Sequence, residues 1–176
     1  MTASEYLKHW EKNKVWTHIN QSRHRKRFKT CADYCEGKTF VDVGCVYGHS
    51  TKLLSTLKSG IWSGLDFAEK AIIRAKELFP EISFYYAKDY DLLPICGKFD
   101  SVICTEVIEH VPEDKIFINS LINITNKILI VTTPNKHVND PGHLRLYTEE
   151  SLSKLFENYN FEIIKTGPFF YIIVRK

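Results

Sequence analysis

The sequence predicts an α/β protein built on one doubly wound sheet of seven strands, mostly parallel with an antiparallel last strand, plus N-terminal helices. Three observations support this. From residue 38 onward, apolar runs alternate with helical patterns five times, which requires a mainly parallel sheet covered by helices on both faces. The last two apolar runs are joined only by Gly167 and Pro168, too few residues for a crossover helix. A content of 44% hydrophobic and 26% charged residues in 176 residues is typical of one globular domain.

The N-terminal part of the chain has the pattern of a helical segment. Residues 3–35 contain no Gly or Pro and place apolar side chains among charges, a pattern typical of amphipathic helix. Gly37 ends this segment. We therefore expect one domain over residues 1–176, with residues 1–36 as a helical cap on a core of residues 37–176.

The elements of the core follow in order. Strands are expected at residues 39–43, 61–65, 82–86, 99–104, 128–132, 161–166 and 170–174. Helices are expected at about residues 48–58, 68–79 and 113–126. A further helix should begin after Thr148, an N-cap residue followed by two acids in the positive first turn.

Composition also bears on location and partners. The 24 Lys and Arg residues against 21 Asp and Glu residues give a net charge of +3, which names no partner. The longest purely apolar stretch, residues 169–174, is far shorter than the roughly 20 residues of a membrane span. No apolar signal segment follows Met1. Five Cys residues without a C-x-x-C pair favour reduced thiols, so we expect a cytoplasmic protein.

Polar residues and glycines follow the predicted strands, where the carboxyl ends of a parallel sheet form its ligand site. The first four strands place these residues at that edge: Asp42, Gly44, Cys45, Gly48, Asp66, Phe67, Asp89, Tyr90, Thr105 and Glu106. A single acid after a strand is usually a helix cap. Three acids after three successive strands, beside a glycine turn, favour one shared pocket.

Two nucleotide-binding patterns compete for the glycine turn. A dinucleotide site needs G-x-G-x-x-G, but a start at Gly44 puts Val46 and His49 at the other glycine positions. The pattern D-x-G-x-G-x-G is matched by Asp42, Gly44 and Gly48, with Val46 as the departure. A β-branched residue disfavours positive φ and adds bulk at that point.

On these residues the chain resembles the class I S-adenosylmethionine-dependent methyltransferases over residues 38–176. The motifs that carry the resemblance are VDVGCVYG at 41–48, GLDFAEKAI at 64–72, YAKDYDLLP at 86–94, FDSVICTEVIEHVPED at 99–114 and ILIVTTPN at 128–135. The resemblance implies a Rossmann-like fold and S-adenosylmethionine as cofactor. It also implies that the Gly44–Gly48 loop lies against the methionine and adenosyl portions. Asp66 would accept both ribose hydroxyls, and Asp89 the adenine amino group, with Tyr90 beside the ring.

The segment after the fourth strand carries the candidate chemistry. Glu106, Glu109 and His110 have the spacing of one face of a helical turn, and His143 lies in a loop expected to return over the same edge. Two carboxylates and two imidazoles could hold Mg²⁺ or Mn²⁺. The alternative makes His110 a general base or orienting residue, with Glu109 as its catalytic partner and Glu106 near the methionine end.

This E-x-x-E-H segment is similar to two branches of the family. One is the ubiquinone-biosynthesis-type O-methyltransferases, the nearest in motif pattern. The other is the small-RNA 2′-O-methyltransferases, whose matching residues hold a metal, which implies Glu106, Glu109, His110 and His143 as ligands. We therefore expect O-methyl transfer to a small-molecule or RNA hydroxyl. The alternatives are a non-catalytic S-adenosylmethionine-binding or partner-binding module, favoured by Val46, and, less well supported, a dehydrogenase.

Two further segments leave alternatives open. Residues 23–29 form the densest run of positive charge, which could contact RNA or an anionic lipid surface, or could be a solvated helix face with Phe28 packed inward. Arg145 and Tyr147 could shape the acceptor site, or Tyr147 could belong to the core. A homodimer that covers the acceptor is also compatible with the sequence.

Overall fold

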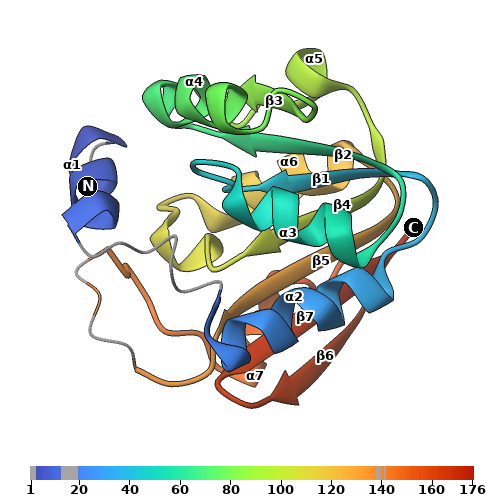
Figure 1. Ribbon diagram of the computed structural model, residues 1–176. Helices are drawn as coiled ribbons and strands as arrows, with labels where there is room; N and C mark the ends of the chain where they lie inside the picture. The colour runs from blue at the N-terminus through green and yellow to red at the C-terminus, as the bar shows by residue number, and fades with distance from the viewer. Residues whose placement is uncertain (1–2, 13–19, 138–139, 141) are drawn as a thin grey trace.

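The computed structural model describes residues 3–12, 20–137, 140 and 142–176 (Figure 1). Within them, one seven-stranded sheet has the order β3-β2-β1-β4-β5-β7-β6. The strands are β1 (Thr39–Val43), β2 (Ile61–Asp66), β3 (Ser83–Tyr86), β4 (Phe99–Thr105), β5 (Thr125–Pro134), β6 (Asn160–Thr166) and β7 (Phe169–Arg175). Strands β3, β2, β1, β4 and β5 are parallel, and β7 runs antiparallel to both β5 and β6. The predicted fold class is confirmed.

Helices cover both faces of the sheet. They are α1 (Ala3–Lys12), α2 (Ser22–Tyr34), α3 (His49–Leu57), α4 (Glu69–Leu78), α5 (Leu93–Cys96), α6 (Asp114–Asn123) and α7 (Glu149–Leu155). Figure 1 shows α2 and α3 in front of the sheet and α6 behind it. Alternate residues of β5 therefore enter different cores: Ile128 and Ile130 pack with α2 and α3, and Leu129 and Val131 with α6 and α7.

The N-terminal segment that the sequence predicts as helical is helical where it is described. Helices α1 and α2 lie within the predicted helical segment, and residues 13–19 of that prediction lie outside the described residues. Helix α1 lies beside the carboxyl edge of the sheet in Figure 1, away from α2. In the part of the chain that the structure describes, no helix has the length and apolar character needed to span a membrane.

One helix end differs from the prediction. Helix α6 ends at Asn123 instead of residue 126, and β5 already begins at Thr125. The buried Thr125 hydroxyl donates a hydrogen bond of 2.6 Å to the Leu121 carbonyl, which turns the chain from helix into strand. Strand β5 also continues to Pro134, because its last residues pair with Phe169 and Phe170 of β7.

The turn after β4 is shorter than the spacing predicted. Only Ile108–His110 forms a helical turn, the short 3₁₀ turn η2. Glu106 precedes it with a φ of 57°, a left-handed conformation that is uncommon outside glycine. Glu106 therefore does not share the helical face of Glu109 and His110. The helix predicted after Thr148 is confirmed, since the Thr148 hydroxyl accepts a hydrogen bond from the Ser151 amide at the start of α7.

Candidate functional site

Asp42, in β1, fixes the start of α3 and with it the end of the loop between β1 and α3. Its buried carboxylate accepts hydrogen bonds from the Ser50 hydroxyl at 2.6 Å and the Thr51 hydroxyl at 2.9 Å. Burial raises the pKa of Asp42, and these two hydrogen bonds oppose the rise. Asp42 thus fastens the first turn of α3 to β1. The loop glycines Gly44 and Gly48 have φ angles of 85° and 77°, which glycine adopts without strain.

Val46, the departure from the glycine pattern, also has positive φ, at 47°. Such a backbone is strained for a β-branched residue. Its side chain is buried in a small apolar cluster with Leu7 of α1 and with Ala68 and Ala71. A further contact joins the same elements, because the Tyr47 hydroxyl donates to Glu11 of α1 at 2.6 Å. Helix α1 therefore docks on the loop through an apolar contact and a hydrogen bond.

Asp66, at the end of β2, is buried beside this cluster and only 1% exposed. One carboxylate oxygen accepts from the Val46 amide at 2.9 Å and the other from the Ala68 amide at 2.8 Å. Burial raises the pKa of Asp66 to about 6, although these amides lower it. The Phe67 amide also donates to this carboxylate, which leaves acceptor capacity for a further donor, because a carboxylate has about four lone-pair sites. The neighbouring Phe67 is 47% exposed.

The burial of Asp66 predicts a pH-dependent stability. Because its pKa is raised from 3.8 to about 6, folding favours the protonated form. The associated stability is present below pH 3.8 and is lost as the pH rises through 6, by up to about 3 kcal/mol. Asp66→Asn lacks this titration, so its stability relative to the wild type should increase between pH 4 and pH 7. Urea unfolding of both proteins at the two pH values measures the change, and an equal difference at both would contradict it.

Asp89 and Tyr90 lie at the far end of the same edge. Asp89 is exposed and accepts from the Asp91 amide at 3.1 Å. Tyr90 packs on Phe117 of α6 with ring centroids 5.5 Å apart, and both Asp89 and Tyr90 line a cavity of about 360 Å³. Ahead of them, the Ala87 amide donates to the Asp66 carbonyl at 3.0 Å. The two acids expected at the nucleoside thus differ, since Asp66 is buried and Asp89 is open.

A larger cavity of about 850 Å³ opens between α1, the loop and α4. Residues from all three elements line it: Leu7, Lys8, Glu11, Tyr47, His49, Lys70, Arg74 and Leu78. A volume of this size is within the range of small-molecule sites. Cys45, in the same loop, is fully buried, and burial raises the pKa of its thiol well above its usual value, which makes it an inert core residue.

Glu106 follows the half-buried Thr105 at the end of β4 and contacts two other elements. One of its oxygens accepts from the Thr132 hydroxyl at 3.4 Å. The other lies 3.5 Å from Nη1 of Arg27, which is only 5% exposed. Burial raises the pKa of Glu106, and the Arg27 charge opposes the rise. The prediction of a basic face for residues 23–29 missed this inward guanidinium, although Arg27 shares a helical stripe with the buried Cys31 four residues on.

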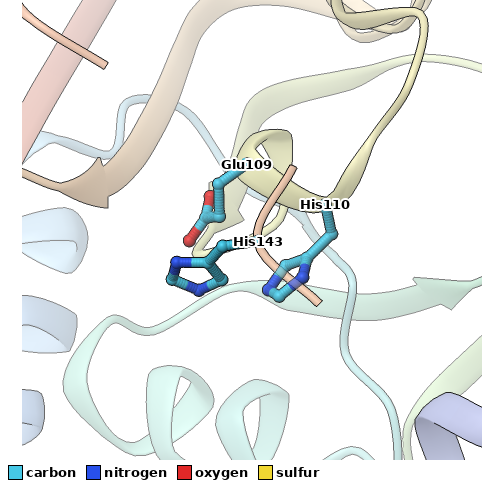
Figure 2. A group of neighbouring side chains, drawn as sticks. All are labelled: Glu109, His110 and His143. Carbon is cyan, nitrogen blue, oxygen red and sulfur yellow. The ribbon is translucent and has the colours of Figure 1, made fainter. Parts of the chain in front are cut away.

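Three of the four predicted metal ligands come together. Figure 2 shows the Glu109 carboxyl group turned toward the His143 ring, with the His110 ring beside them. One ligand atom from each residue lies within 4.8 Å of the others. The two imidazole rings are 4.7 Å apart at their centroids and nearly perpendicular, at 77°. The structure does not bring Glu106 into this group, because it lies against Arg27 and Thr132 instead.

Glu109 is the most deeply buried member of the cluster, at 1% exposure. Its Oε2 accepts from the Thr133 hydroxyl at 3.2 Å. Among the described residues its Oε1 has no hydrogen-bond partner. Burial, followed by the nearby Glu106 charge, raises the pKa of Glu109 well above its usual value. Burial, reinforced by His110, lowers the pKa of His143. The cluster therefore consists of a buried carboxyl oxygen and two imidazoles. Burial favours the neutral form of one of these imidazoles, that of His143.

The loop that carries His143 is fixed to the η2 turn. The Leu144 amide donates to the Glu109 carbonyl at 2.8 Å. A Cβ on Gly142 would lie 2.9 Å from Nδ1 of His110, so any other residue there would displace the His110 ring. Sequence reasoning missed Gly142, because nothing in its flanking residues signals the close approach.

Arg145 and Tyr147 anchor this loop to α6. The Tyr147 hydroxyl donates to Asp114 at 2.8 Å, and Nη2 of Arg145 donates to the Pro112 carbonyl at 2.9 Å. Tyr147 is 5% exposed and belongs to the larger core. Of the two interpretations of Tyr147, the core residue is the one that the structure supports.

The basic segment divides between surface and interior. Arg23, Arg25 and Lys26 are exposed, whereas Arg27 and Phe28 are buried. Phe28 packs inward, as expected from the interpretation of this segment as a solvated helix face. The exposed charge of this segment is accordingly smaller than its sequence indicates.

Comparison with known proteins gives a family match. The model of the family described as "Methyltransferase domain" matches residues 35–166. A probable S-adenosylmethionine-dependent methyltransferase of Mycobacterium tuberculosis is 23% identical over 122 residues, which are 68% of this chain and 44% of that protein. A 2-methyl-6-phytyl-1,4-hydroquinone methyltransferase of Synechocystis is 25% identical over 130 residues, 70% of this chain and 41% of that protein.

A solved structure supports the fold. Magnesium protoporphyrin IX methyltransferase of Synechocystis, with S-adenosylmethionine bound, aligns with a TM-score of 0.69 at 19% identity. The alignment covers 100% of this chain and 98% of that one. The matches to the two curated relatives, in contrast, cover less than half of each relative's length.

Proposed function

The chain belongs to the methyltransferase-domain family, among the class I S-adenosylmethionine-dependent enzymes, and we propose that it transfers a methyl group from S-adenosylmethionine to a hydroxyl oxygen. Residues 1–36 would form a cap on a catalytic core of residues 37–176. The group that accepts the methyl would be a hydroxyl of a small molecule or of RNA. S-adenosylmethionine supplies a methyl group already activated by a sulfonium, so the chain has to orient the acceptor and manage its proton.

The cofactor's nucleoside is assigned to the ends of β2 and β3. The Asp66 carboxylate already accepts the backbone amides of Val46, Ala68 and Phe67 and keeps acceptor capacity for a ribose hydroxyl. Asp89 and Tyr90 follow shortly after Ala87, whose amide donates to the Asp66 carbonyl. Gly44, Gly48 and the exposed Phe67 complete the surroundings of this edge.

The main support for methyl transfer to an oxygen atom is the buried Glu109, which faces His110 and His143. A hydroxyl nucleophile must lose its proton during methyl transfer, and a positioned base assists that loss. Oε1 of Glu109, which has no hydrogen-bond partner among the described residues, lies close to the two imidazoles, and η2, which carries Glu109 and His110, follows β4. In this assignment Glu109 and His110 receive and hold the proton of the acceptor hydroxyl.

Calorimetry and labelled-methyl transfer test the proposal together. We expect S-adenosylmethionine and S-adenosylhomocysteine to bind, and NAD not to bind. Incubation with methyl-labelled S-adenosylmethionine and a panel of phenols, amines and RNA oligonucleotides should label oxygen atoms only. Label on nitrogen alone would overturn the oxygen assignment. Cofactor binding without any transfer would favour the non-catalytic module, and binding of NAD alone would favour the dehydrogenase.

Entry of the cofactor requires a movement, because Asp66 is only 1% exposed beside Leu7 and Val46. Leu7→Ala weakens the docking of α1 and should raise the affinity for S-adenosylhomocysteine, by up to about tenfold, since the open form becomes more populated. Calorimetry measures the change, and Lys8→Ala, at an exposed neighbouring position, is the control. A weaker affinity in Leu7→Ala would instead make α1 part of the binding surface.

The same cluster fits a divalent cation, as a further part of the proposal. Glu109, His110 and His143 would hold Mg²⁺ or Mn²⁺, and the orphaned Oε1 of Glu109 is the kind of atom that such an ion satisfies. A bound cation would supply Lewis-acid activation of the acceptor hydroxyl. Glu106, which pairs with Arg27, is left out of this ligand set.

Titration with Mn²⁺ alone tests the cation site without any substrate. We expect one site per chain by calorimetry, with affinity reduced at least tenfold in His143→Ala, because one of three ligands is removed. His137→Ala removes an imidazole outside the cluster and is the matched control. Equal heats in the wild type and His143→Ala would exclude the cluster as the site.

The class of acceptor is a separate question. Of the four exposed cations of α2, Lys29 pairs with Asp33, and Arg23, Arg25 and Lys26 could contact phosphate groups. An RNA acceptor would therefore show salt-dependent binding that is lost in the triple alanine variant. Binding that is absent at low salt would leave a small-molecule hydroxyl as the acceptor.

A further inference from the structure

The cavity of about 850 Å³ between α1, the β1–α3 loop and α4 lies outside the site proposed for methyl transfer (Figure 1). None of the described residues that line it is assigned to the cofactor, the acceptor hydroxyl or the cation. Leu7 lines the cavity and also packs against Val46 and Ala68, whose amides bind Asp66. The cavity therefore adjoins the cover of Asp66 without including Asp66 itself.

Three cations from two helices line this cavity. Lys70 and Arg74 are four residues apart on α4 and so share one helical face, and Lys8 comes from α1. The ion pairs found among the described residues include neither Lys8 nor Lys70. Arg74 pairs with Glu77 at 2.7 Å on the surface, a weak kind of contact that leaves most of the five guanidinium N–H donors available.

Glu11 is the one acid among the described residues that line the cavity. It already accepts a hydrogen bond of 2.6 Å from the Tyr47 hydroxyl. Burial and the neighbouring Glu11 raise the pKa of Tyr47, whereas the Arg74 charge lowers it, so the charge of Arg74 acts on this hydroxyl inside the cavity. Three positive charges against one negative charge favour an anionic ligand.

The rest of the lining is apolar or aromatic. Leu7 and the partly exposed Leu78 provide aliphatic surface, and Tyr47 provides a ring. Burial lowers the pKa of His49, so its ring contributes a neutral hydrogen-bonding group at neutral pH. A ligand that fills this cavity must therefore combine an anionic group with an apolar or aromatic body.

A phosphate group suits the three cations better than a carboxylate does. A phosphate monoester carries a charge of about −1.5 to −2 at pH 7 and has three acceptor oxygens. It can therefore accept from donors on two helices at once. A carboxylate has one charge and two oxygens, which Lys70 and Arg74 of α4 would satisfy without Lys8 of α1.

We propose that this cavity binds a phosphate monoester with an apolar or aromatic body, and that the phosphate bridges Lys8 of α1 to Lys70 and Arg74 of α4. Such a bridge stabilises the docked position of α1, whose Leu7 belongs to the cover of Asp66. The ligand should therefore lower the affinity for S-adenosylhomocysteine, since coupling between two binding sites is reciprocal. This last step rests on the proposed function, whereas the phosphate site does not.

Calorimetry with phenyl phosphate tests the site, in a phosphate-free buffer at about pH 8, where the probe is a dianion. Benzoate keeps the ring with a carboxylate, and inorganic phosphate lacks the ring. Lys70→Ala and Lys8→Ala each remove one cation of the cavity. Lys76→Ala removes an exposed cation of α4 that does not line it, and Asp66→Asn alters the nucleoside site alone.

We expect one site per chain, with phenyl phosphate bound at least about tenfold more tightly than inorganic phosphate, because its ring is buried. Benzoate should bind more weakly than phenyl phosphate. Lys70→Ala and Lys8→Ala should each weaken phenyl phosphate binding about fivefold, whereas Lys76→Ala and Asp66→Asn should bind it like the wild type.

The coupling is measured in the same way. Saturating phenyl phosphate should weaken S-adenosylhomocysteine binding about threefold or more in the wild type. The same concentration should have a smaller effect in the variant that combines Lys70→Ala with Lys8→Ala. Without the probe, that variant should bind S-adenosylhomocysteine like the wild type, which also shows that it is folded.

Each part of the proposal has an outcome that would overturn it. Equal affinity for phenyl phosphate in the wild type, Lys70→Ala and Lys8→Ala would exclude the cavity, and weakening in Asp66→Asn would place the probe in the nucleoside site. Tighter binding of benzoate would exclude phosphate as the anion. Weakening in Lys70→Ala but not in Lys8→Ala, or no effect on S-adenosylhomocysteine, would exclude the bridge to α1. A wild type that binds phenyl phosphate but not S-adenosylhomocysteine would overturn the proposed function and support the phosphate site, so the two failures are distinguishable.

Discussion

Asp66→Ala is expected to abolish measurable binding of S-adenosylhomocysteine, with a loss of at least about 100-fold. Two hydrogen bonds from ribose hydroxyls to a carboxylate contribute roughly 1.5–3 kcal/mol each, and both disappear. The substitution also removes the acceptors of the Val46 and Ala68 amides, so the loop over the site is held to β2 only by the bonds of the Gly44 and Cys45 amides to the Leu65 carbonyl. Both effects weaken binding.

Calorimetry with S-adenosylhomocysteine measures this loss. Asp66→Asn keeps one oxygen acceptor and should retain an intermediate affinity. Glu77→Ala, which removes an exposed carboxylate on α4 that pairs with Arg74, should bind like the wild type. Unchanged affinity in a folded Asp66→Ala protein would mean that the nucleoside lies elsewhere.

The fold and the edge that carries the candidate site could be predicted from the sequence because they follow from local patterns. Alternation of apolar runs with helical segments requires a parallel sheet, and the two residues between β6 and β7 allow only a hairpin. Glu109 and His110 are adjacent in η2, and His143 joins them because the loop after β5 returns to this turn, where the Leu144 amide donates to the Glu109 carbonyl. Strand periodicity and turn length are properties of neighbouring residues.

The features that could not be predicted depend on long-range packing. In the sequence, Arg27 cannot be distinguished from the other cations of residues 23–29. Its contact with Glu106 depends on how α2 packs on the sheet. The cover over Asp66 needs Leu7, nearly sixty residues away in the chain. Glu106 has the spacing of a ligand beside Glu109, but its left-handed backbone directs its carboxylate to another partner.

Val46 shows how a departure from a motif can be accommodated. The left-handed backbone that glycine would adopt freely is retained at φ 47°, and its strain is of the order of 1–3 kcal/mol. Burial of the side chain with Leu7, Ala68 and Ala71 offsets that strain. The sequence indicated the conflict, whereas the compensating contact comes from a helix whose docking no local pattern reveals.

Glu109→Gln is expected to lower kcat for methyl transfer by about 10²- to 10⁴-fold, the range that a positioned proton acceptor contributes. Glutamine has nearly the same shape and keeps an oxygen for the Thr133 hydroxyl. It cannot take up a proton from the acceptor hydroxyl or provide a carboxylate to a cation. The rate measured with the acceptor identified by methyl labelling should therefore fall, while the affinity for S-adenosylhomocysteine stays within about threefold of the wild-type value.

The burial of Glu109 separates this effect from unfolding. Because burial disfavours the charge of this carboxyl group and so raises its pKa, its replacement by a neutral amide should not lower the melting temperature. Glu113→Gln, at an exposed position beyond the turn, should leave both rate and stability unchanged. A Glu109→Gln protein with near wild-type kcat would show that the acceptor's proton leaves by another route, and Glu109 would then be only a structural residue beneath the loop.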